Sequence, residues 1–163
     1  MEKPGIRIEI PGFGNRTIQT VVSDYTGTLS YHGRLTPGVA ARLRRLGKFV
    51  RLEIVTADTY GTARQQLRGI AAPHMLEKKR QDIEKRDFVK QFSLKHVAAF
   101  GNGNNDCLLL RLVRNAGGLA IAVDNGEGCA LDALLNANIS IFGATDALDL
   151  ILKPNALRAT LRF

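Results

Sequence analysis

The sequence is poor in long apolar runs, in cysteine and in acidic residues. Every apolar run is shorter than about ten residues, too short for a helix across a bilayer or for the core of a secretory signal. The sequence therefore predicts neither, and we expect a cytoplasmic protein with no membrane partner. The two cysteines, Cys107 and Cys129, have no second Cys or His at metal-ligand spacing. We expect small, buried, structural thiols in a reducing compartment, with a redox or zinc site as the less favoured alternative.

The shortage of acidic residues leaves the chain strongly basic. Lys and Arg number 23 against 15 Asp and Glu, a formal net charge of +8. This balance suits polyanions, acidic membrane surfaces and phosphorylated substrates without choosing among them. The basic residues form two groups: Arg42, Arg44, Arg45, Lys48 and Arg51, then Lys78, Lys79 and Arg80. Nucleic acid is one candidate partner with weak support, because a solvated helix face is the more common outcome for such a group.

The length of 163 residues suits one compact domain. No low-complexity linker and no repeat with a period of about 20 to 50 residues divides the chain, so we expect residues 1–163 to form a single domain. Short apolar segments rich in β-branched residues predict six strands. These strands cover residues 6–10, 18–23, 49–55, 96–100, 119–123 and 139–142.

Helical patterns separate most of the later strands. Thr36 and Pro37 are typical of a helix start, apolar residues follow at helical spacing, and Gly47 is well placed to end the helix. Further helices are predicted over residues 60–68, 82–92, 105–115 and 127–137. Strands that are apolar on both faces are expected of a parallel sheet that helices cover on each side. The prediction is an α/β protein with a three-layer, Rossmann-like fold and a mainly parallel central sheet.

Ligands bind such sheets beyond the carboxyl ends of the strands, so the polar residues that follow each strand are the first candidates. The segment 21–29 is an apolar strand that ends on Asp24 and then turns through Gly27. A carboxylate in this position can attack phosphorus or hold a metal ion. An ordinary turn explains the same residues and remains open at this point.

A second segment ends a strand on Thr56, Ala57 and Asp58, just before a predicted helix. A hydroxyl and a backbone N–H at a helix start make a site for an anion such as phosphate. Capping of that helix is the alternative use of Asp58. Further along, Lys85 lies near the start of a helix in a charged stretch, and taken alone it is best explained as a solvated surface residue.

A glycine-rich loop follows the strand predicted at residues 96–100. Its sequence, Gly-Asn-Gly-Asn-Asn-Asp over residues 101–106, lacks the third glycine of a dinucleotide-binding loop and lies late in the chain. The helical pattern after it argues against a hairpin turn. A tight turn that brings amide and carboxylate oxygens to a helix start suits Mg²⁺.

In this order and spacing, the four segments resemble the motifs of the haloacid dehalogenase-like superfamily of phosphohydrolases and phosphotransferases, in particular the phosphorylation domain of P-type ATPases. The likeness covers about residues 18–124 and rests on four matches. Asp24-Tyr25-Thr26-Gly27-Thr28-Leu29 is similar to the first motif in its ATPase form, Thr56-Ala57-Asp58 to Thr-Gly-Asp, Lys85-Arg86-Asp87-Phe88-Val89 to the lysine motif, and Gly101-Asn102-Gly103-Asn104-Asn105-Asp106 to Gly-Asp-Gly-x-Asn-Asp.

The resemblance implies that Asp24 is a nucleophile that forms an aspartyl phosphate, with Lys85 neutralising both the carboxylate and the phosphate. It also implies three phosphate-binding residues: Thr56 through its hydroxyl, Ala57 through its N–H, and Asn105. Mg²⁺ is the implied cofactor. Its implied ligands are Asp24, the main-chain carbonyl of Thr26, Asn102 and Asp106.

Two positions depart from the phosphatase pattern. Thr26 stands where most phosphatases of the superfamily carry a second aspartate as general acid and base, which is worth about 10²- to 10⁴-fold in rate. We therefore expect slow turnover and an aspartyl phosphate that accumulates. Asn102 replaces a carboxylate with a neutral amide, which should weaken Mg²⁺ binding. A catalytically weak module that binds phosphate or regulates a partner is the alternative function.

The chain leaves little room for a cap over the site. Only residues 29–52 and 59–84 are available for one, enough for a flap near residues 31–36 and a helix in the first gap, and for a helix plus a short strand in the second. We therefore expect no cap domain. Such an open site favours a phosphorylated macromolecule, or a homo-oligomer whose neighbouring subunit covers the mouth above a small substrate. His32 lies on the expected flap, where a solvated loop residue is the alternative interpretation.

Overall fold

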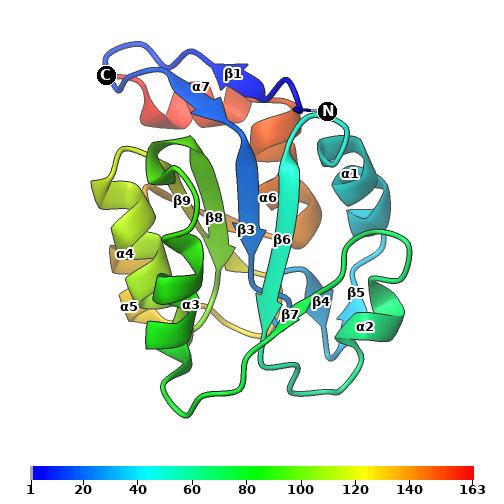
Figure 1. Ribbon diagram of the computed structural model, residues 1–163. Helices are drawn as coiled ribbons and strands as arrows, with labels where there is room; N and C mark the ends of the chain where they lie inside the picture. The colour runs from blue at the N-terminus through cyan, green and yellow to red at the C-terminus, as the bar shows by residue number, and fades with distance from the viewer. Residues whose placement is uncertain (1) are drawn as a thin grey trace.

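The computed structural model describes residues 2–163, and a six-stranded parallel sheet forms its centre (Figure 1). The strand order is β10-β9-β8-β3-β6-β7. Their bounds are Thr20–Ser23 for β3, Arg51–Thr56 for β6, His74–Met75 for β7, Val97–Gly101 for β8, Leu119–Asp124 for β9 and Ile139–Phe142 for β10. The predicted α/β fold with a parallel sheet is confirmed.

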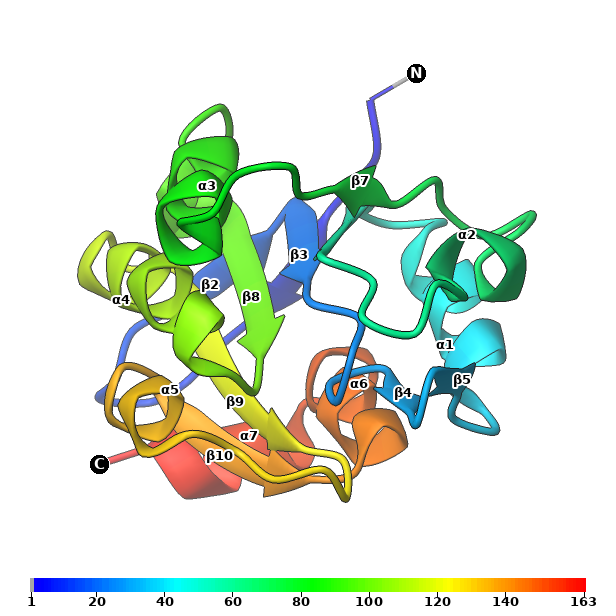
Figure 2. The same cartoon turned by 90° about the horizontal axis from the view of Figure 1, so that it is seen from below.

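Helices cover both faces of the sheet, as Figure 2 shows. One face packs against α1 (Val39–Leu46), α6 (Ala144–Leu152) and α7 (Asn155–Leu161). The other packs against α3 (Gln81–Val89), α4 (Cys107–Asn115) and α5 (Leu131–Leu135). Val21 of β3 joins the first core and its neighbour Val22 joins the second, because successive side chains of a strand point to opposite faces.

The predicted strand over residues 18–23 is two strands. The first, β2 (Arg16–Ile18), pairs antiparallel with β1 (Ile6–Ile8) outside the main sheet. The break falls at Gln19, whose N–H donates to His96 of the short 3₁₀ turn η1 (Leu94–His96) and whose carbonyl accepts from Arg51. The chain thus turns at Gln19 from the hairpin into the sheet.

Several helices are shorter than predicted. Helix α1 begins after Gly38, not at Thr36, because Gly38 has a left-handed φ of +89° that no helix residue adopts. The Thr36 hydroxyl accepts from Asn125 Nδ2 at 2.8 Å. Helix α2 spans only Ala63–Gln66, and α4 is preceded by a 3₁₀ turn, η2 (Asn104–Asp106). The pattern over residues 127–137 yields only α5.

The short connections leave the carboxyl end of the sheet open. Between β3 and α1 lies the hairpin of β4 (Ser30–Tyr31) and β5 (Arg34–Leu35), and between β6 and α3 lie α2 and β7. Residues 2–163 contain no inserted cap domain, as predicted. Within the same residues, no helix has the length and apolar character required to cross a membrane. Both cysteines are free, but they are half-buried where full burial was expected.

Candidate active site

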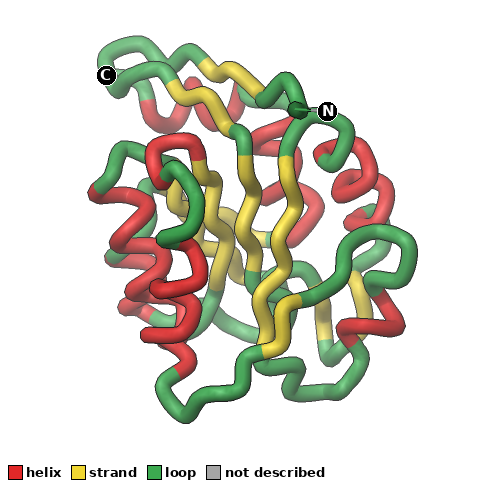
Figure 3. Tube along the Cα trace, viewed as in Figure 1, coloured by secondary structure: helices red, strands yellow, loops and turns green. Residues whose placement is uncertain are grey.

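The carboxyl ends of β3, β6 and β8 bring the first, second and fourth motifs together. Because β3 lies between β6 and β8, Asp24, Thr56 and Gly101 reach the same edge of the sheet, where the loops gather in Figure 3. The Asp24 N–H continues the ladder by donating to the Phe100 carbonyl at 3.0 Å. The juxtaposition expected from the sequence is therefore present.

The third motif meets Asp24 through Lys85, which extends from α3. Lys85 Nζ lies 2.7 Å from Asp24 Oδ1 and 2.7 Å from Asp106 Oδ1. We call Asp24, Lys85 and Asp106 the lysine cluster; their exposed fractions are 5%, 1% and 0%. The interpretation of Lys85 as a solvated surface charge is wrong, because its side chain is enclosed and paired.

Burial and charge act against each other in the lysine cluster. Desolvation, reinforced by Asp106, outweighs the Lys85 ammonium and raises the pKa of Asp24 to about 6. Burial alone would lower the pKa of Lys85, but the two carboxylates outweigh it and raise that pKa above its ordinary value. Near neutral pH, Asp24 is thus a carboxylate beside a permanent ammonium, as a nucleophile for phosphorus requires.

Asp106 holds the glycine-rich loop through hydrogen bonds to its backbone. Its Oδ2 accepts from the N–H groups of Asn102 at 3.0 Å and Gly103 at 2.9 Å, while Oδ1 accepts from Lys85. A Cβ on Gly101 would lie 2.5 Å from Asp106 Cβ, so the approach requires glycine. Asp106 therefore fixes both the loop and the lysine.

Two oxygen atoms converge on the hydroxyl of Thr28. Thr28 Oγ1 lies 3.1 Å from Asp24 Oδ2 and 3.2 Å from Asn102 Oδ1. Carboxylate, amide and main-chain carbonyl oxygens are the hard donors that Mg²⁺ takes, so the kinds of donor here fit that ion. Their charge is low, and residues 2–163 contain no group of three or more His, Cys, Asp and Glu side chains placed to hold a metal.

Thr26 carries a polar atom that nothing in the described chain satisfies. Its Oγ1 is buried and is the one enclosed side-chain oxygen or nitrogen of residues 2–163 without a hydrogen-bond partner. Unpaired buried hydroxyls are costly and are often found where a ligand binds. The atom belongs to the residue two positions after Asp24.

Thr56 and Asp58 of the second motif make different hydrogen bonds. Thr56 is fully buried, and its Oγ1 accepts from the Asp58 N–H at 2.9 Å, which leaves the hydroxyl proton available for an anion. Asp58 Oδ1 accepts from the N–H groups of Thr62 at 3.0 Å and Ala63 at 3.1 Å. Asp58 therefore caps the start of α2, the structural alternative considered above. Ala57 lies half-buried between them.

Asn105 and Thr28 make contacts that the motifs did not predict. The Asn105 amide donates to Gln81 Oε1 of α3 at 3.1 Å and so ties the loop to that helix. Thr28 was missed as a site residue, although its hydroxyl faces the Asp24 carboxylate. Its position four residues after Asp24, across a glycine turn, was the available signal.

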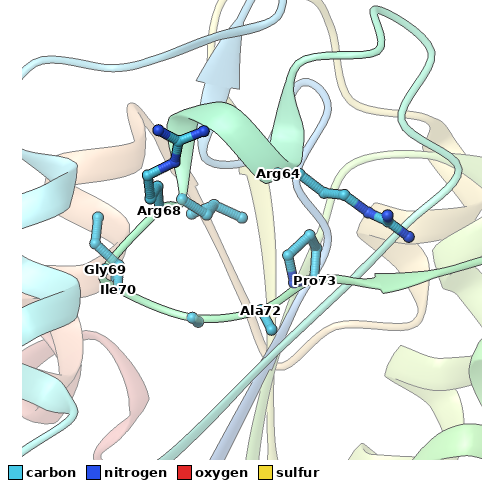
Figure 4. Close-up of a pocket in the computed structure, with 8 residues that line it drawn as sticks. Arg64, Arg68, Gly69, Ile70, Ala72 and Pro73 are labelled. Atoms are coloured by element: carbon cyan, nitrogen blue, oxygen red, sulfur yellow. The ribbon is translucent and has the colours of Figure 1, made fainter.

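A hollow of about 630 Å³ lies elsewhere, beside α2 (Figure 4). It is lined by Arg64, Leu67, Arg68 and residues 69–73. Size alone would make it a candidate, but no residue of the lysine cluster or of the second and fourth motifs lines it. Its two arginines are exposed, so it belongs to the basic surface and not to the chemistry around Asp24.

No protein-family model matches the chain. One curated protein, the uncharacterized protein MJ0073 of Methanocaldococcus jannaschii, is 46% identical over 68 residues. The match covers 42% of this chain and 69% of that protein.

Solved structures share the fold at low sequence identity. The 3-deoxy-D-manno-octulosonate 8-phosphate phosphatase of Moraxella catarrhalis, solved with a magnesium ion, a phosphate ion and KDO, has a TM-score of 0.58 at 16% identity, over 88% of this chain and 90% of that chain. The cobalt-bound phosphatase of the same activity from Haemophilus influenzae has 0.59 at 16%, over 90% and 94%. The haloacid dehalogenase-like protein SP0104 of Streptococcus pneumoniae has 0.53 at 14%, over 76% and 93%. These likenesses establish a haloacid dehalogenase-like fold.

Proposed function

We propose that this chain, which belongs to one family with the M. jannaschii protein and has the haloacid dehalogenase-like fold, is a Mg²⁺-dependent phosphohydrolase or phosphotransferase that uses Asp24 as its nucleophile. The observation that carries the proposal is the buried ion pair between Asp24 and Lys85 at 2.7 Å, at the carboxyl edge of the sheet. A structural ion pair has no need to lie at that edge beside an unpaired hydroxyl. The phosphatase neighbours support the proposal at the level of the fold.

The reaction has two steps. In the first, an oxygen of Asp24 forms a bond to phosphorus while the ester bond breaks, and the leaving oxygen takes a proton from water. In the second, water attacks phosphorus, which releases phosphate and restores the carboxylate. Lys85 balances the charge of both anions, and the Thr56 hydroxyl and the Ala57 N–H bind phosphoryl oxygens.

The residues suited to hold Mg²⁺ are Asp24, the Thr26 carbonyl and Asn102. When bound, Mg²⁺ would supply positive charge against the phosphoryl oxygens. Asp106 was expected among the ligands. Its three hydrogen bonds favour a positioning role for it instead, because they leave few of its lone pairs free.

Thr26 sets the expected rate. A threonine hydroxyl does not exchange protons near neutral pH, so neither step has a general acid or base at this position. This residue is also what carries the likeness to the P-type ATPase phosphorylation domain. We infer slow turnover with a phosphoenzyme that accumulates.

The test is hydrolysis of p-nitrophenyl phosphate with Mg²⁺, followed by rapid acid quench. We expect Mg²⁺-dependent phosphate release and an acid-stable, hydroxylamine-labile phosphoenzyme, both lost in Asp24→Asn. Asp87→Asn, an exposed carboxylate on α3, is the matched control and should leave both unchanged. Release that persists in Asp24→Asn would contradict the proposal.

The second candidate function is a module that binds phosphate without turnover. The observation in its favour is that Thr26 and Asn102 both replace charged groups at the site. It predicts that phosphate binds with Lys85-dependent affinity while no substrate is hydrolysed. Calorimetric titration of phosphate into the wild type and Lys85→Met separates binding from turnover.

The open mouth leads to two further proposals on partners. Either the phosphate is carried by a macromolecule, for which the net charge of +8 provides attraction, or a second copy of the chain covers the mouth above a small substrate. Sedimentation analysis with and without substrate distinguishes them. A monomer in both conditions favours the macromolecular substrate.

A further inference from the structure

Three exposed aromatic side chains gather on the loops around the mouth. Tyr31, His32 and Tyr60, which we call the aromatic rim, include two of the three tyrosines of the chain. Tyr31 is 50% exposed and Tyr60 is 44% exposed. The Tyr31 and His32 ring centroids lie 4.2 Å apart in an edge-to-face arrangement, and those of His32 and Tyr60 lie 6.2 Å apart.

Two rings of the aromatic rim lie on loops that begin at candidate site residues. Tyr31 comes directly after Ser30, which forms a backbone bridge with Thr26. Tyr60 comes two residues after Asp58, in the loop that begins at Thr56. The rim is therefore carried by the same two loops that hold Thr26 and Thr56 at the carboxyl edge of the sheet.

The loop after β9 holds the rings in place. Glu127 accepts from the Tyr60 hydroxyl at 3.1 Å through Oε1 and from the His32 N–H at 3.2 Å through Oε2. The Tyr31 ring lies against Gly126, where a Cβ would come within 3.0 Å of it. The neighbouring Gly128 carbonyl accepts from Asn102 Nδ2 at 3.3 Å. One loop thus joins the rim to the candidate metal site.

The base of the hairpin is fixed as well. The Gly33 carbonyl accepts from the Tyr25 hydroxyl at 2.9 Å and from the Thr62 hydroxyl at 2.5 Å. His32 has φ of +49°, a conformation that costs energy for a residue other than glycine. The rings are therefore ordered before any ligand arrives, which lowers the entropic cost of binding to them.

We propose that the leaving group of the substrate carries a planar aromatic ring that stacks on the aromatic rim, as the base of a nucleoside monophosphate or of the phosphorylated end of an oligonucleotide does. This inference rests on the proposed function. Ordered, solvent-exposed aromatic rings bind bases through their π-faces without regard to sequence. The basic character of the chain adds attraction for the phosphates. An aliphatic sugar phosphate lacks the π-face that stacks on these rings.

The first experiment compares adenosine 5′-monophosphate with ribose 5-phosphate, which differ only in the base. Stacking on one base predicts a KM at least about tenfold lower for the nucleotide. Equal kcat/KM for the two compounds would overturn the inference and leave the phosphohydrolase intact. Hydrolysis of neither compound, while p-nitrophenyl phosphate is still hydrolysed, would overturn the inference alone. Loss of p-nitrophenyl phosphate hydrolysis as well would overturn the proposed function. A titration of Asp24→Asn with the same two compounds checks the preference in binding alone.

The second experiment separates stacking from a purely structural role of the rings. Tyr60→Phe keeps the ring and loses the bond to Glu127, whereas Tyr60→Leu loses both. Stacking predicts that Tyr60→Phe keeps the preference for the nucleotide while Tyr60→Leu and Tyr31→Leu each reduce it about tenfold. Equal losses in Tyr60→Phe and Tyr60→Leu would show that the rings only fix the hairpin. Phe142→Leu, on an exposed ring of β10, is the control and should keep the preference.

The two sources of the base are distinguished by length. A 5′-phosphorylated oligoadenylate and adenosine 5′-monophosphate share the terminal nucleotide. A rim that stacks on one base can therefore bind either compound. A lower KM for the oligonucleotide that rises steeply with salt identifies the polymer as the substrate. Equal KM values identify the free nucleotide. If neither is bound more tightly than ribose 5-phosphate, the inference is wrong.

Discussion

The lysine cluster and the aromatic rim are neighbours with opposite physical character. The cluster is almost fully buried, and all its charges are mutually paired at 2.7 Å. The rim is about half exposed and is attached mainly through one carboxylate, that of Glu127. The proposed nucleophile is thus fixed by the core, whereas the surface proposed to meet the leaving group lies on loops, which tolerate substitution more readily than the core does.

The cluster should be far more sensitive to substitution than its surroundings. Lys85→Met leaves two buried carboxylates without their cation, and breaking a buried pair in this way costs about 3–5 kcal/mol. We expect that loss in the free energy of unfolding, measured by urea denaturation, together with loss of turnover.

Lys90→Met provides the control for that variant. Lys90 lies just after the same helix and pairs with Asp87 on the surface, so its removal should change the free energy of unfolding by no more than about 0.5 kcal/mol. Similar losses in the free energy of unfolding for the two variants would show that the buried cluster is no more sensitive than the surface.

Asp24→Asn should raise the free energy of unfolding at neutral pH, because the ionised Asp24 destabilises the folded lysine cluster. The folded protein raises the Asp24 pKa from 3.8 to about 6, so it binds that proton more tightly than the unfolded chain. This contribution to stability is therefore present at low pH and is lost as pH rises from about 4 to about 6.

In metal-free buffer, the variant should match the wild type near pH 4 and exceed it by about 2–3 kcal/mol at pH 7. Urea denaturation at several pH values measures the difference. A difference in the free energy of unfolding that does not depend on pH would show that folding does not raise the Asp24 pKa.

Asn102→Asp changes a residue that lies between the lysine cluster and the aromatic rim, and it should change the Mg²⁺ requirement. The substitution adds a charge to an oxygen that already faces Thr28, so the Mg²⁺ concentration that gives half-maximal activity should fall about tenfold. Asn104→Asp, an exposed position in the same loop, is the matched control. Equal Mg²⁺ titrations for the two variants would remove Asn102 from the ligand set.

Glu127→Gln should have the smallest effect on the fold. Gln keeps an acceptor for one of the two bonds to the rim, and both are exposed, so the thermal midpoint should hardly move. Tyr60 becomes more mobile, and we expect a modest rise in the KM of aromatic phosphates. A large drop in the midpoint would place the rim with the structural core.

The sequence predicts the sheet because its strands are apolar on both faces, as at residues 119–123. It predicts Asp24, Thr56 and the glycine-rich loop as neighbours because parallel strands place their carboxyl ends at one edge. The helix pattern alone does not predict the environment of Lys85, since it does not show which helix face meets a distant carboxylate; only the resemblance placed Lys85 beside Asp24.

The interruption at Gln19 and the shortness of α2 were also beyond the sequence. Both depend on hydrogen bonds between distant segments, such as that from Gln19 to His96. The aromatic rim is invisible for the same reason, because Tyr31, Tyr60 and Glu127 are far apart in the chain. The resemblance predicted a chemistry for the four motifs, which stays a prediction, and the fold supplied the distances between their residues.

The carboxyl-terminal residue has a practical consequence for experiments. The Phe163 N–H donates to the Pro11 carbonyl at 3.2 Å, beside the β1–β2 hairpin, at the opposite end of the sheet from the mouth (Figure 1). A dye or surface attachment placed there would leave the mouth facing solution. Long polymers could then be presented to immobilised protein without the support blocking their approach.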